Sequence, residues 1–114
     1  MNSIEVKEHL LEFSSYQHEE FRFRDTAGKQ IAKGIKFAHE LIQKTPVLDD
    51  PVKYLELLEE LLAKERTRIR GSGDDDPDGR VLAGMEMVMN EVELQRRTPG
   101  APRDHGAPGA RTGR

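Results

Sequence analysis

Residues 16–44 decide the fold, and they read YQHEEFRFRDTAGKQIAKGIKFAHELIQK. On a single helix at about 100° per residue, their side chains separate onto two faces. The apolar face carries Tyr16, Phe23, Ala27, Ile31, Gly34, Ile35, Ala38, Leu41 and Ile42. The opposite face carries a narrow basic stripe of Arg22, Lys29, Lys33 and Lys36. The pattern predicts one long amphipathic helix over 16–44, which other helices cover along its apolar face.

The start of this helix leaves a second possibility open. Residues 21–24 alternate apolar and basic side chains as a strand does, and Asp25 and Thr26 can cap a new helix. Residues 16–44 therefore form either one helix or two. Gly34 lies beside the apolar face, where the missing side chain allows another helix to approach closely.

The chain before this stretch predicts a short first helix over 3–13. Ser3 is a suitable N-cap, and Glu5 and Glu8 stand in the first turns, where the helix dipole favours acidic side chains. Ser14 and Ser15 have hydroxyl groups that compete for backbone hydrogen bonds, so we expect them to end this helix.

A third helix is predicted over 51–69. Pro46 ends the preceding helix, because the residue before a proline avoids the α region. Asp49 or Asp50 then supplies an N-cap, and Pro51 occupies the first helical position. The connection between the second and third helices is short, so we expect these two to pack against each other in antiparallel orientation.

A fourth helix is predicted over 79–97, with Asp78 as its cap. Its apolar side chains recur at helical spacing: Val81, Leu82, Met85, Val88, Met89 and Val92. Residues 98–114 contain no large apolar side chain and cannot bury a core. The sequence therefore predicts an all-α fold, a small bundle of three to four helices over 1–97, followed by a disordered basic tail over 98–114.

Composition excludes several classes of protein. The chain has 114 residues, which suits one domain, and it contains no cysteine for disulfides, thiol catalysis or a thiolate metal site. No apolar run approaches the roughly 20 residues that a membrane span needs. The first residues also lack the basic-then-apolar pattern of a signal peptide. We expect a cytoplasmic or nuclear protein without a membrane anchor.

Signatures of catalysis are also missing from the sequence. There is no glycine-rich phosphate loop, no dinucleotide-binding glycine pattern and no nucleophile elbow. The four histidines lack the spacings that build zinc or di-iron sites on helices. We therefore expect neither an enzyme nor a bound cofactor.

The acidic loop offers a possible metal site. Asp74, Asp76 and Asp78, followed by Gly79, match the first half of an EF-hand calcium loop, whose alternating carboxylates converge on the ion. The position of the bidentate glutamate is occupied by Met85, which removes a major ligand. The competing interpretation is a solvated linker, and we prefer it to a calcium site.

Two surfaces are candidates for binding a macromolecule. The helix over 51–69 has an unusually wide apolar face that includes Tyr54, Leu55, Leu58 and Leu62, and one small bundle is not expected to cover it. This face favours self-association, with a homodimer as the expected assembly. The basic stripe of Arg22, Lys29, Lys33 and Lys36 could instead follow the phosphates of duplex RNA or DNA.

The absence of catalytic signatures and the methionine-containing fourth helix favour a non-catalytic protein–protein interaction module, such as a regulatory adaptor or inhibitor. The formal net charge is only -3, and Asp25 and Glu40 interrupt the basic stripe. A nucleic-acid-binding protein is therefore the alternative rather than the main expectation.

Overall fold

The computed structural model describes residues 2–72, 76 and 78–97. This part of the chain forms four α-helices and no strand: α1 (Ser3–Arg22), α2 (Thr26–Lys44), α3 (Pro51–Ser72) and α4 (Arg80–Arg97). The predicted all-α bundle is therefore confirmed. The predicted disordered tail, residues 98–114, lies outside the described residues.

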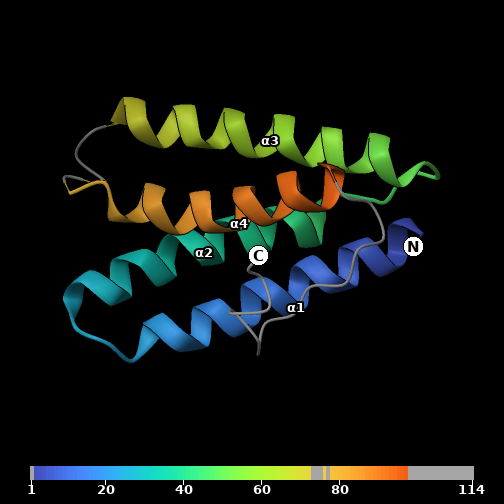
Figure 1. Cartoon of the computed structure of the whole chain (residues 1–114). Helices are drawn as coiled ribbons and strands as arrows, with labels where there is room; N and C mark the ends of the chain where they lie inside the picture. The colour runs from blue at the N-terminus through green and yellow to red at the C-terminus, as the bar shows by residue number, and fades with distance from the viewer. Residues whose placement is uncertain (1, 73–75, 77, 98–114) are drawn as a thin grey trace.

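Helix α4 occupies the middle of the bundle (Figure 1). It packs mainly against α2 and against α3, and α1 packs mainly against α2. Figure 1 shows α1 along one edge of the bundle and α3 along the opposite edge. The expected antiparallel orientation of α2 and α3 is confirmed, but their direct contact is small, because α4 packs between them along most of their length. Helix α4 is thus covered by helices of its own chain.

The core is built from side chains of all four helices. Its fully buried members include Leu10 of α1, Ile35 of α2, Leu58 of α3 and Met85 of α4, each 0% exposed. Every helix thus buries an apolar stripe against the others, which is the condition for a stable small bundle.

Glycines allow α2 and α4 to touch backbone to backbone. A Cβ atom placed on Gly34 would lie 1.8 Å from the carbonyl oxygen of Val81, and one on Gly84 would lie 2.0 Å from that of Ile31. No side chain fits in either place. The prediction that another helix approaches closely at Gly34 is confirmed, and that helix is α4.

The long helix predicted over 16–44 is wrong, because the chain breaks between Arg22 and Thr26. The side chain of Asp25 accepts a hydrogen bond from the Gly28 amide at 3.0 Å and so caps α2. The break lets α1 fold back along α2 and bury its own apolar stripe. The second possibility left open by the sequence, a new helix at Asp25 and Thr26, is the observed one.

Two further expectations about this region are wrong. Tyr16 and Phe23, placed on the apolar face of the long helix, are 57% and 72% exposed. Ser14 and Ser15 do not end the first helix, because α1 continues through both of them. The Ser14 hydroxyl donates to the Leu11 carbonyl oxygen at 3.1 Å, so it is satisfied inside the helix.

The later helices begin close to the predicted positions. Asp50 accepts a hydrogen bond from the Val52 amide at 2.9 Å, and Pro51 opens α3. Asp76, not Asp78, caps α4: its two carboxylate oxygens accept hydrogen bonds from the amides of Val81 and Leu82, each at 3.0 Å.

Candidate functional site

The leucine-rich face predicted for self-association lies in the core of one chain. Tyr54, Leu58 and Leu62 are 0% exposed, and Leu55 is 1% exposed. Burial also raises the pKa of Tyr54 to about 12. The bundle therefore covers the wide apolar face by itself, and the physical reason given for a dimer through these four residues is wrong.

The predicted basic stripe survives in part. Lys29, Lys33 and Lys36 are exposed on the outer side of α2 and form what we call the lysine face. Arg22 belongs to α1 instead, where its guanidinium pairs with Glu19 at 3.1 Å and covers the ring of Phe23 at 4.2 Å. The stripe thus loses its first member because the long helix is interrupted.

The acidic loop does not present converging carboxylates in the described residues. Asp74 lies outside them. Asp76 uses both carboxylate oxygens to cap α4, and Asp78 pairs with Arg80 at 3.3 Å. Over the described part of the chain, no three histidine, aspartate or glutamate side chains are grouped to hold a metal ion.

The outer face of α1 carries exposed aromatic and acidic side chains together. We call it the α1 face and define it by Glu8, Glu12, Tyr16, Glu19 and Phe23. Tyr16 and Phe23 are among the few large apolar side chains that the structure leaves exposed. Tyr16 lies on α1, and Phe23, seven residues later, is the residue that ends the helix as its C-cap. The sequence prediction missed this surface because it ended the first helix before Tyr16.

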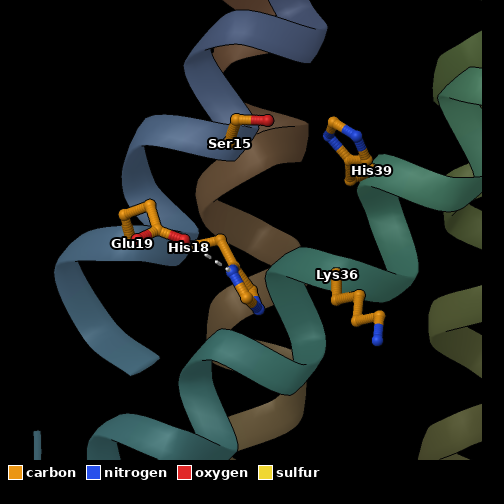
Figure 2. Close-up of a pocket in the computed structure, with 5 residues that line it drawn as sticks. All are labelled: Ser15, His18, Glu19, Lys36 and His39. Carbon is orange, nitrogen blue, oxygen red and sulfur yellow. Dashed lines mark ion pairs between the residues drawn. The ribbon is translucent and has the colours of Figure 1, made fainter. Parts of the chain in front are cut away.

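A pocket of about 220 Å³ opens between α1 and α2. Figure 2 shows Ser15, His18 and Glu19 on α1, and Lys36 and His39 on α2. The Ser15 hydroxyl points toward the His39 side of the pocket, while the ammonium group of Lys36 points away from both imidazole rings. The ring of His18 lies 4.0 Å from the Glu19 carboxylate. These groups do not converge on one point, so the pocket lacks the geometry of a catalytic site.

His39 joins the two helices at the back of this pocket. Its Nδ1 atom lies 2.6 Å from the Ser14 hydroxyl oxygen, and the Ser14 side chain is 0% exposed. Burial lowers the pKa of His39; the nearby Glu40 opposes this shift, and His18 adds to it. The contact is a structural link between α1 and α2, because a buried serine hydroxyl cannot reach a substrate.

A polar cluster links α1 to α4 on the inner side. The Nε2 atom of His9 lies 2.8 Å from the Glu91 carboxylate, and the amide nitrogen of Gln95 donates to the same oxygen at 3.2 Å. Glu91 is 3% exposed and Gln95 is 1% exposed. Buried groups of this kind need such partners, so the cluster fixes how α1 sits on α4.

The hollow between α3 and α4 is lined by carboxylates that form ion pairs. It has a volume of about 490 Å³ and is lined by Glu59, Glu86 and Glu93 among others. Each of these carboxylates has an arginine partner: Glu59 pairs with Arg96 at 2.6 Å, Glu86 with Arg66 at 3.6 Å, and Glu93 with Arg97 at 3.5 Å. The hollow therefore offers no unbalanced charge to a ligand.

Two tests bear on the class of protein. Within the described residues, none of the helices combines the length and the apolar character that crossing a membrane requires. Comparisons with protein-family models, with curated proteins and with solved structures found no match.

Proposed function

We propose that the protein is a non-catalytic protein-binding module that acts in the cytoplasm or nucleus and binds its partner through the α1 face. The observation that carries this proposal is the exposure of two aromatic side chains, Tyr16 on α1 (57%) and Phe23 at its C-cap (72%). Scattered single apolar residues at a surface need no explanation, whereas two large exposed aromatic rings within eight residues favour a contact surface.

Aromatic side chains are suited to this task. They bury a large area at a small cost in conformational entropy, and tyrosine in particular is enriched among the residues that dominate binding energy. The ring of Phe23 is held under the guanidinium of Arg22 at 4.2 Å. This contact orients the ring before a partner arrives, which reduces the entropy lost on binding.

The charges of the α1 face indicate the chemistry of the partner. Glu8, Glu12 and Glu19 are exposed along the same helix as Tyr16. A partner with lysine or arginine side chains around an apolar centre complements this arrangement, and opposite charges speed the encounter. The surface is therefore suited to a basic helix or groove of another protein.

Affinity capture with matched variants tests the proposal. The full chain and the Tyr16→Ala, Phe23→Ala double variant serve as bait in extracts of the native host. Leu48→Ala is the control, because Leu48 is 40% exposed and lies in the connection between α2 and α3, away from the α1 face. We expect partners that the control retains and the double variant loses. Equal capture by all three baits would contradict the proposal.

The alternative function is binding to duplex RNA or DNA through the lysine face. It is favoured by one observation: among the described residues, Lys29, Lys33 and Lys36 pair with no carboxylate, although all three are exposed. Three such charges on consecutive turns of α2 can contact phosphates without reading sequence.

Fluorescence anisotropy with labelled duplex RNA and DNA tests this alternative. Binding at about 50 mM salt should weaken steeply by about 200 mM salt, because bound phosphates release counterions. The Lys29→Glu, Lys33→Glu, Lys36→Glu variant should lose the binding without losing its helical circular dichroism. Unchanged binding by this variant would exclude the lysine face as the site.

A further inference from the structure

We propose that the partner of the α1 face is a second copy of this chain, with α1 of each copy lying on the lysine face of the other. This inference rests on the proposed function, because it names the partner of the same surface. It replaces the predicted self-association through the leucine-rich face of α3, because that face is buried in the core of one chain.

Charge complementarity is the first argument. The α1 face presents the exposed carboxylates Glu8, Glu12 and Glu19, and the neighbouring α2 presents the exposed ammonium groups of the lysine face. Acidic side chains thus predominate on the outer face of α1 and basic side chains on that of α2, with Arg22 on α1 and Glu40 on α2 as exceptions. A single small molecule with one face of each sign is complementary to a copy of itself.

The second argument is that several of these charged side chains form no ion pair within the described part of the chain. Among the described residues, Glu8 and Glu12 form no ion pair, and neither do Lys29, Lys33 and Lys36. Glutamates and arginines on the other helices, in contrast, are paired across α3 and α4. Glu8 and Glu12 of the α1 face and the three lysines of the lysine face are therefore available to a second molecule, whereas Glu19 is already paired with Arg22.

Symmetry is the third argument. Helices α1 and α2 are antiparallel neighbours at one side of the bundle (Figure 1). A two-fold axis that passes between them places α1 on the partner's α2, and α2 on the partner's α1, in a single operation. Every acidic–basic contact is then made twice, and the assembly closes as a dimer.

The lysine face is shorter than the α1 face, so it can lie along part of it. At about 1.5 Å per residue, Glu8 to Glu19 spans roughly 17 Å of α1, and Lys29 to Lys36 spans roughly 11 Å of α2. The ring of Tyr16 gives lysine side chains a second favourable contact, because an ammonium group is attracted to the face of an aromatic ring. Lys33 already makes a contact of this kind with Phe37 in its own chain, at 5.8 Å from the ring centre.

A charge-swap experiment tests the dimer. The acidic-to-basic variant carries Glu8→Lys and Glu12→Lys, and the basic-to-acidic variant carries Lys29→Glu and Lys33→Glu. Masses are measured by sedimentation equilibrium at low salt over a range of protein concentrations. The wild type should dimerise, and each variant alone should bind its own copy at least about tenfold more weakly, because like charges now face each other.

Mixing the two variants gives the sharpest outcome. In the mixed pair, lysines on α1 of one chain meet glutamates on α2 of the other, and the native charges meet at the second contact. We therefore expect the equimolar mixture to recover the dimer, with affinity that falls as salt rises. A control variant, Lys53→Glu with Glu56→Lys on the exposed side of α3, should dimerise as the wild type does.

Three results would overturn the inference: a monomeric wild type at every concentration, variants that dimerise normally, or a mixture that stays monomeric. Circular dichroism of each variant confirms that the fold is intact, so that a lost dimer reports on the surface alone. If the chain is monomeric but capture of another protein still depends on Tyr16 and Phe23, the proposed function stands and only the second copy is excluded.

Discussion

At the scale of the residue, Gly34 and Gly84 set the distance between the two central helices. The atoms that an added Cβ would meet belong to the backbones of α4 and α2, at 1.8 Å and 2.0 Å respectively. A flexible side chain could move aside, but a helix backbone moves only if the whole helix shifts. The packing of α4 in the middle of the bundle therefore depends on two missing side chains.

This dependence predicts that Gly34→Ala destabilises the protein by about 2 kcal/mol or more, as overpacking of a well-filled core does. Gly84→Ala should behave in the same way. Urea denaturation followed by circular dichroism measures the change in the free energy of unfolding. The matched control is Gly71→Ala in α3, where an added Cβ meets nothing within 4 Å. A neutral Gly34→Ala variant would show that α2 and α4 are farther apart than described.

A second prediction at this scale concerns His39. Because burial lowers its pKa, the folded protein resists a proton that the unfolded chain accepts once the pH falls below about 6.5. The free energy of unfolding should therefore fall on acidification through this range. His39→Asn cannot take up this proton, so its free energy of unfolding should fall less between about pH 7 and pH 5. Parallel pH dependences of the two proteins, measured by urea denaturation, would contradict the assignment.

The sequence predicts the surroundings of some residues correctly and those of others wrongly. Gly34 was predicted to allow a close helix approach because it interrupts an apolar stripe, and this is confirmed by the contact with Val81. Tyr16 and Phe23 were placed in the core because helical spacing alone assigned them there, yet both are exposed. The sequence prediction extended the helical spacing of α2 back to these two residues. Because the chain breaks between Arg22 and Thr26, the spacing of α2 does not tell which way the side chains before the break face.

At the scale of the element, the break between α1 and α2 decides how the surface is arranged. One continuous helix would carry both Glu19 and Lys29, so acidic and basic side chains would share its surface. Two antiparallel helices instead place an acidic face and a basic face side by side. Sequence could identify Asp25 as a possible cap, but only the burial of Val6 and Leu10 against the other helices makes the break favourable.

The start of α4 gives a prediction at the same scale. Asp76 accepts hydrogen bonds from two amides of the first turn, and Gly79 follows with a φ of 72°, where glycine is favoured. Asp76→Ala should destabilise the protein by about 1–2 kcal/mol, as loss of a helix cap does. Asp78→Ala should change stability little, because Asp78 is exposed and its pair with Arg80 is a surface contact.

Thermal melts of both variants, with and without added calcium, measure these effects. A stabilisation of the wild type by calcium that Asp76→Ala abolishes would contradict the assignment of Asp76 as a cap alone. Equal melting temperatures for Asp76→Ala and Asp78→Ala would show that the first turn of α4 does not depend on the side chain of Asp76.

At the scale of the whole molecule, the apolar residues are sufficient to cover one another within one chain. The sequence predicted a dimer because α3 has apolar side chains over a wide arc of its surface. The order of residues along one helix does not show how many other helices pack against it. Helix α4 against α3, together with contacts from α2 and α1, covers this arc and leaves Tyr54 and Leu62 with no exposed surface. Fold class was thus predictable from periodicity, whereas the order of the helices in space was not.

A self-sufficient core predicts that folding does not depend on protein concentration once the charged faces are screened. At about 1 M salt the Debye length is about 3 Å, so attraction between the α1 face and the lysine face should be weak. The melting temperature should then stay constant on dilution. At low salt it should rise with concentration, because a dimer that binds only the folded chain stabilises it. A melting temperature that falls on dilution at high salt would mean that apolar surface is shared between chains, and that the four buried residues of α3 are covered by a partner after all.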